Sequence, residues 1–155
     1  MPLNDLLGPE SVYPALKATS KKQALQILAE KAALQTGLDE RDIFRTLIAR
    51  EKLGSTGVGH GVAIPHGKLA SLDRIHGFLA RASTPIEFEA VDEQPVDLIF
   101  LLLAPEDAGA EHLKVLAKVA RIMREPDRLA RIRAAAGTKG ILGALVVDGT
   151  KSDAA

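Results

Sequence analysis

The sequence predicts an α/β fold: a single domain with a mixed β-sheet and helices on both faces. A near-continuous apolar run over residues 96–104, bounded by prolines, is typical of a central strand covered on both faces. Segments with helical periodicity lie before and after this run. At 155 residues, the chain suits one core of ordinary size better than two. We therefore predict one domain over residues 1–148 and a disordered tail over 149–155.

The first elements are predicted from local patterns. Residues 11–18 partly alternate apolar and other side chains, and Pro14 restricts this segment to an edge strand. Ser20 and Gln23 have the spacing of a capping box, and apolar residues then recur at helical intervals until a glycine. This pattern predicts a helix over residues 21–36.

A second helix is predicted between Asp39, which can cap it, and Gly54, which ends it. Residues 58–64 alternate apolar side chains with Gly, His, Gly and Ala, which predicts a strand whose backbone is closely approached. Residues 75–80 and 86–88 predict two further short strands.

Three helical segments are expected after the central strand. Residues 110–124 carry an apolar stripe that begins at Leu113, with His112 in the first turn. Residues 127–136 follow a proline, which suits the first position of a helix. Residues 139–147 could form a last helix, although its two glycines weaken it by roughly 1 kcal/mol each.

The composition excludes several classes of function. Basic and acidic residues number 20 each and aromatic residues make up 3%, so neither a strong field nor stacking platforms exist for nucleic acid. The absence of cysteine excludes disulfides and thiolate chemistry. No segment has the length of a membrane span or the pattern of a signal peptide, so we expect a cytoplasmic protein without membrane insertion. We interpret one basic cluster as a solvated surface: Arg121, Arg124, Arg128, Arg131 and Arg133.

The glycine-rich stretch from Arg50 to Lys68 is the predicted location of chemistry. Within it, His66 stands between Pro65, which restricts the preceding backbone, and Gly67, which leaves the following backbone free. This arrangement can set an imidazole at the end of a strand. His66 is therefore the first candidate for a functional side chain.

Several known site types do not match this stretch. A phosphate-binding loop needs four residues between its glycines and a hydroxyl after its lysine, but five separate Gly61 from Gly67 and Leu69 follows the lysine. The other glycines lead into a strand, unlike a dinucleotide fingerprint. The four histidines match no zinc spacing, and Ser55 lacks the glycine of a hydrolase elbow. We predict no cofactor and no metal.

A nucleophilic histidine remains. Neutral imidazole, with a reference pKa of roughly 6.5, can attack phosphorus, and the transferred group needs hydrogen-bond donors and a cation. Arg50, Ser55 and Thr56 can supply these to a phosphoryl group near His66. Alternatively, Arg50 compensates a helix end, and the two hydroxyls shape the turn. Lys68 is either a partner contact or a solvated charge.

Residues 50–68 read Arg-Glu-x-x-Gly-Ser-Thr-Gly-x-Gly-x-Gly-x-Ala-Ile-Pro-His-Gly-Lys, and Glu-His-Leu opens a later helix. This pattern resembles the enzyme IIA components of the fructose/mannitol class of the phosphoenolpyruvate-dependent phosphotransferase system, most closely the nitrogen-regulatory branch. Segments beginning at Ser20, Asp92 and Leu116 also resemble that branch, so the resemblance covers about residues 3–145.

The resemblance implies that His66 accepts a phosphoryl group from the phosphohistidine of an HPr-like phosphocarrier protein. It also implies that His112 lies beside His66 and that Arg50 and Ser55 support the phosphoryl oxygens. His112 could instead be a solvated residue of a first helical turn. His60 and His76 are expected to have no role.

The implied function is that of a regulatory phosphoryl carrier, which signals through its phosphorylation state to targets such as kinases or transporters. Two alternatives stay open. One is a sugar-specific enzyme IIA that passes phosphate to a transporter domain, and the other is a non-catalytic binding module of the same fold.

Overall fold

The computed structural model describes residues 3–146. In this part of the chain six strands form one mixed sheet, in the order β1-β5-β6-β3-β2, with β4 also paired to β6. The strands are β1 (Val12–Leu16), β2 (Gly57–Gly59), β3 (Val62–Ala63), β4 (His66–Leu69), β5 (His76–Ile86) and β6 (Val96–Pro105). The helices are α1 (Leu3–Leu6), α2 (Lys21–Thr36), α3 (Glu40–Leu53), α4 (Gly109–Ile122), α5 (Pro126–Ala134) and α6 (Thr138–Val146), and a short 3-10 helix covers Pro9–Ser11.

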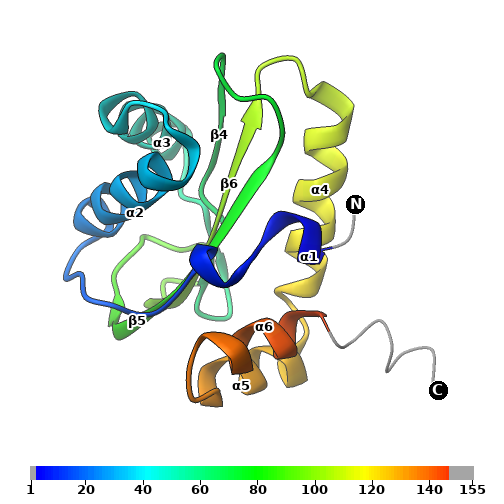
Figure 1. Ribbon diagram of the computed structural model, residues 1–155. Helices are drawn as coiled ribbons and strands as arrows, with labels where there is room; N and C mark the ends of the chain where they lie inside the picture. Colours follow the sequence, from blue (N-terminus) through cyan, green and yellow to red (C-terminus); the bar gives the residue numbers. More distant parts are fainter. Residues whose placement is uncertain (1–2, 147–155) are drawn as a thin grey trace.

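Helices cover both faces of the sheet, with α2 and α3 on one side and α4 on the other (Figure 1). The predicted α/β class is therefore confirmed. The predicted tail over residues 149–155 lies outside the described residues.

Strand β6 is buried on both faces, as its apolar run predicts. Leu101 and Leu103 belong to the core beneath α2 and α3, whereas Phe100 and Leu102 belong to the core beneath α4, α5 and α6. All four side chains are fully buried. The strand pairs with β5 on one side and with β3 and β4 on the other, so it places the first residue of β4, His66, beside Leu102.

The ends of α2 follow the sequence signals. The Ser20 hydroxyl accepts a hydrogen bond from the Gln23 amide at 3.1 Å, and Gly37 ends the helix with a φ of 78°. The predicted edge strand is also found, because β1 pairs only with β5 among the described strands. Asp39 occupies the capping position of α3, but its side chain makes no capping bond there.

Two strand predictions were wrong in detail. Residues 58–64 do not form one strand: β2 and β3 are antiparallel and are joined by a turn in which His60 and Gly61 have φ of 59° and 76°. Positive φ at two successive residues is the geometry of a tight hairpin turn. Conversely, residues 75–80 and 86–88 are not two strands. Strand β5 runs through residue 86, with an irregular register after Arg81.

The predicted apolar stripe of α4 was wrong at its first residue, whereas Met123 is fully buried and Leu116 and Ala120 pack against the core. Leu113 is 66% exposed, and the buried residues are His112, Val115, Val119 and Ile122. The buried face thus includes the positions directly before the predicted ones, which brings His112 inward.

The last predicted helix is present as α6, in spite of its glycines. A Cβ at Gly140 would lie 3.0 Å from the Ala135 Cβ, so this glycine permits the close approach of α6 to the end of α5. Arg128 of α5 is 1% exposed, which corrects its assignment to a solvated surface. Its guanidinium donates to the carbonyls of Ala144 and Leu145 at the end of α6.

Candidate functional site

His66 opens β4 directly after Pro65, and it is paired with Leu102 of the central strand. Its ring is half-buried, and its Nδ1 lies 2.8 Å from the Ile64 carbonyl oxygen. Because a carbonyl only accepts hydrogen bonds, this contact assigns the proton of the neutral ring to Nδ1. The other ring nitrogen, Nε2, therefore carries the lone pair.

Arg50 lies in the last turn of α3 and reaches this lone pair. Its Nε donates to the Nε2 of His66 at 3.3 Å, and its Nη1 donates to the Gly54 carbonyl at 2.8 Å. Helix α3 comes this close to β4 because residue 67 is glycine, since a Cβ there would lie 2.5 Å from the Thr46 Cγ2. The close packing of α3 against β4 thus allows Arg50 to contact His66.

His112 approaches His66 from the first turn of α4. The two ring centroids are 6.0 Å apart, with the rings at 70° to each other. The His112 side chain is buried, and its Nε2 has no hydrogen-bond partner among residues 3–146. A buried polar atom without a partner is costly unless a ligand supplies one. The first turn of a helix also favours an anion nearby.

Both histidines of the site have a lowered pKa. Burial is the largest cause of the lowered pKa of His66. Arg50 lowers it further, whereas the Ile64 carbonyl and Glu51 act in the opposite direction. Burial also lowers the pKa of His112, with contributions from His66 and Lys68. Both rings are therefore predominantly neutral at pH 7.

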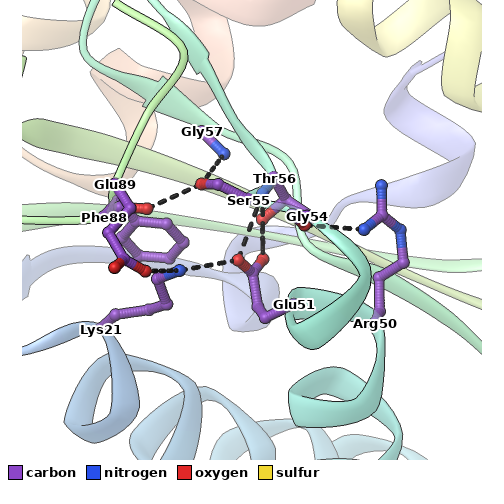
Figure 2. Close-up of polar contacts among 9 residues, drawn as sticks. All are labelled: Lys21, Arg50, Glu51, Gly54, Ser55, Thr56, Gly57, Phe88 and Glu89. Atoms are coloured by element: carbon purple, nitrogen blue, oxygen red, sulfur yellow. Dashed lines mark hydrogen bonds and ion pairs between the residues drawn. The ribbon is translucent and has the colours of Figure 1, made fainter. Parts of the chain in front are cut away.

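The hydroxyls of Ser55 and Thr56 have partners within the protein (Figure 2). Ser55 donates to the Phe88 carbonyl at 2.7 Å and accepts from the Gly57 amide at 3.0 Å. The Thr56 hydroxyl donates to the Glu51 carboxylate. These bonds favour the interpretation that the two hydroxyls shape the turn. Of the predicted site residues, the structure brings the Arg50 guanidinium and the His112 ring close to the His66 ring.

Glu51 was not among the predicted site residues. Its side chain is 5% exposed, and its carboxylate accepts from the Thr56 amide and from Lys21. The signal that could have identified it is its position: a carboxylate in the last turn of a helix opposes the helix dipole, so it needs a partner elsewhere.

The remaining candidates are Lys68, whose charge contributes to the lowered pKa of His112, and two further histidines. Lys68 is exposed on β4, and His60 is exposed at the β2–β3 turn. His76 opens β5 and stacks on Phe78, with 6.4 Å between the ring centroids. Their expected roles stay predictions.

Two further features of residues 3–146 bear on function. In this part of the chain, no three or more histidine or carboxylate side chains are grouped so that they could hold a metal ion. Nor does any helix here have the length and apolar composition to cross a membrane.

The chain matches known proteins along nearly its whole length. Residues 5–146 match the family described as "Phosphoenolpyruvate-dependent sugar phosphotransferase system, EIIA 2". The chain is 56% identical over 147 residues to a nitrogen regulatory protein of Bradyrhizobium diazoefficiens, covering 95% of this chain and 96% of the relative. It is 40% identical over 153 residues to a nitrogen regulatory protein of Klebsiella oxytoca, covering 98% of this chain and 94% of the relative.

A solved structure agrees with these matches. The crystal structure of nitrogen regulatory protein IIA-Ntr from Neisseria meningitidis superposes with a TM-score of 0.88 at 35% identity, covering 92% of this chain and 98% of that one. The protein therefore belongs to the EIIA 2 family of the phosphoenolpyruvate-dependent sugar phosphotransferase system.

Proposed function

We propose that this protein is a regulatory phosphoryl carrier in which the Nε2 of His66 accepts a phosphoryl group from the phosphohistidine of an HPr-like phosphocarrier protein. Membership of the family makes the chain a component of phosphoryl transfer. The single observation that supports the acceptor atom is the position of Nε2. This nitrogen carries a lone pair and lies beside the Arg50 guanidinium, and the His66 ring that holds it lies next to the buried imidazole of His112.

The transfer step follows from this geometry. The lone pair on the Nε2 of His66 attacks the phosphorus of the carrier's phosphohistidine. A new nitrogen–phosphorus bond forms as the old one breaks, and its electron pair returns to the carrier's ring. The proton of the His66 ring stays on Nδ1 throughout, where it is donated to the Ile64 carbonyl. No metal or cofactor takes part in this step.

Two side chains support the transferred group. Arg50 now donates to the lone pair, so its guanidinium must move from the nitrogen to the phosphoryl oxygens as the bond forms. His112 would supply Nε2–H as a second donor, which gives its unpartnered buried nitrogen a ligand. Phosphorylation thus replaces one hydrogen bond at His66 with several to the phosphoryl group.

The regulatory output rests on charge. The formal net charge is zero at pH 7, and a phosphoryl group adds close to two negative charges at one place. A partner protein that contacts this surface can distinguish the two states without a change of fold. The relatives reported above are named nitrogen regulatory proteins, which supports a regulatory role over sugar transport.

The proposal is tested by incubating the protein with purified enzyme I, phosphocarrier and phosphoenolpyruvate, and by measuring intact mass under non-acid conditions. The wild type should gain one phosphoryl group, and His66→Gln should gain none. His112→Gln should still be labelled, but roughly 10²-fold more slowly, because one donor to the developing charge is lost.

Four results would contradict the proposal or narrow it. An unlabelled wild type points to a binding module, and a labelled His66→Gln variant moves the acceptor to another residue. Equal labelling rates for wild type and His112→Gln remove His112 from the site. Passage of the label to a sugar-transport domain would favour the sugar-specific alternative over the regulatory function.

A further inference from the structure

The turn between α3 and β2 is held at both ends by neighbouring residues of α3 (Figure 2). Arg50 donates to the Gly54 carbonyl at 2.8 Å. Glu51 accepts the Thr56 amide with both carboxylate oxygens at 3.2 Å, and it also accepts the Thr56 hydroxyl. Two side chains in the last turn of α3 therefore hold the loop between α3 and β2 in place.

The carboxylate of Glu51 is itself fixed in place. It is nearly inaccessible to solvent and pairs with the Lys21 ammonium at 3.0 Å. Lys21 lies 5.3 Å from the centre of the Phe88 ring and also contacts Glu89 at 3.1 Å. A buried charge with this set of partners has little freedom to move. These contacts explain why an acidic residue is tolerated in the last turn of α3.

The turn has little stiffness of its own. Gly54 has a φ of 151°, a conformation that glycine adopts readily, and glycine restrains the chain less than any other residue. Its carbonyl is also one of the two partners that orient the Arg50 guanidinium, the other being His66. A change in the conformation of the turn would therefore move the Gly54 carbonyl to which Arg50 donates.

We propose that Glu51 is a positioning residue for phosphoryl transfer: by holding Thr56 it fixes the Gly54 carbonyl, which keeps the Arg50 guanidinium directed at His66. This role rests on the proposed function, and Glu51 itself touches neither the phosphoryl group nor its acceptor nitrogen. Lys21 compensates the charge of Glu51, so that the carboxylate can stay beside a site that binds an anion.

Electrostatics alone would not produce the same effect. Glu51 acts to raise the pKa of His66, so removing its charge leaves the acceptor nitrogen at least as available as before. A slower transfer in a variant without this charge is therefore not explained by protonation of the acceptor nitrogen.

The main test compares Glu51→Gln with Glu89→Gln. Both variants remove one carboxylate from Lys21, but only the first changes the partner of Thr56. Glu51→Gln should reduce the maximal rate of phosphoryl transfer roughly 10-fold, with the KM for the phosphocarrier changed by less than about twofold. Glu89→Gln should stay within about twofold of wild type in both constants. A Glu51→Gln variant as fast as Glu89→Gln would overturn the proposal.

A double-mutant cycle separates positioning from a general loss of structure. Arg50→Lys removes the fork that Glu51 is proposed to orient. If Glu51 acts through Arg50, the variant carrying both substitutions should be about as slow as Arg50→Lys alone. If the two losses multiply, Glu51 acts independently of Arg50, and the proposal is wrong.

A measurement on the unphosphorylated protein keeps this proposal distinct from the proposed function. Proton–nitrogen NMR should show the Nε–H of Arg50 as a slowly exchanging signal that is absent from Arg50→Lys, weakened in Glu51→Gln and retained in Glu89→Gln. If the wild type accepts no phosphoryl group, the proposed function fails, but this signal still decides whether Glu51 holds the guanidinium. A signal unchanged in Glu51→Gln overturns the inference. Should that variant not fold, Thr56→Val removes one of the same bonds and should weaken the signal too.

Discussion

The surroundings of the two histidines of the candidate site keep both rings neutral. Burial lowers the pKa of both rings because a cation loses hydration inside the protein. The guanidinium of Arg50 lowers the pKa of His66 further, and His66 does the same to His112. A neutral ring keeps the lone pair that a nucleophile needs. Burial and the Arg50 guanidinium therefore keep the lone pair of His66 available.

These shifts predict that the free energy of unfolding falls as the pH drops from about 7.5 to about 5.5. The pKa values of His66, His76 and His112 lie below the ordinary value of 6.5 in the folded protein. The unfolded chain then takes up protons before the folded one. Stability present above pH 6.5 is lost as the pH falls through and below that value. Urea denaturation at several pH values measures the effect.

His112→Gln provides the comparison, because it removes one of the three contributing rings. Its stability should depend less steeply on pH than that of the wild type. A wild-type stability that stays constant over this range, or rises toward low pH, would contradict the assigned direction of the shifts.

At the scale of elements, the site depends on how closely α3 packs against β4. Gly67 has no left-handed backbone conformation to satisfy, so its importance lies in the space that its missing side chain leaves for Thr46. Helix α3 carries Arg50, and β4 begins with His66. The distance between the two elements therefore sets the contact between the guanidinium and the ring.

Gly67→Ala should destabilise the protein by about 1–3 kcal/mol through overpacking, and it should slow phosphoryl transfer. The added Cβ would meet the Thr46 Cγ2, so α3 must shift away from the strand. Thermal unfolding and labelling rate measure the two effects. Thr46→Ala in the same chain removes the clashing methyl and should restore most of both. If it restores neither, the cost of the alanine has another source than this contact.

The sequence predicted some elements better than others for physical reasons. Local signals such as the Ser20 cap define α2, and the apolar run defines β6, because each depends on neighbours in the chain. The β2–β3 turn was missed because His60 adopts a positive φ, which residues other than glycine seldom do. Alternating residues around such a turn are indistinguishable from one strand.

The site shows the same division between local and tertiary information. The motif and the resemblance that it carries named His66, Arg50 and His112 as candidates, and the structure places these three side chains close together. Glu51 could not be identified in this way, because its partners include Lys21 from another helix and the amide of the following turn. A motif gives the order of residues along the chain, whereas the partner of a buried charge depends on the packing of distant segments.

At the scale of the whole molecule, two cores share one sheet, and the second is completed by the last helices. Ile132 of α5 and Ile141 of α6 are fully buried in the core that also contains residues of α4. Sequence reasoning underestimated α6 because its glycines lower intrinsic helix stability, whereas tertiary contacts supply what is missing. Arg128 is one such contact, since it binds the carbonyls at the end of α6 and pairs with Glu125 at 2.9 Å.

Arg128→Met should therefore lower the free energy of unfolding by about 2–4 kcal/mol, because two helix-terminal carbonyls lose their donor while the buried volume is largely kept. Arg131→Met, an exposed position on the same helix, should change it by less than about 0.5 kcal/mol. Urea denaturation measures both.

Because Arg128 lies in α5, outside the contacts around His66, the folded fraction of the Arg128 variant should be labelled at the wild-type rate. Equal stabilities of the two variants would show that α6 is held by its apolar contacts alone, and slower labelling of folded Arg128→Met would show that the second core also controls the site.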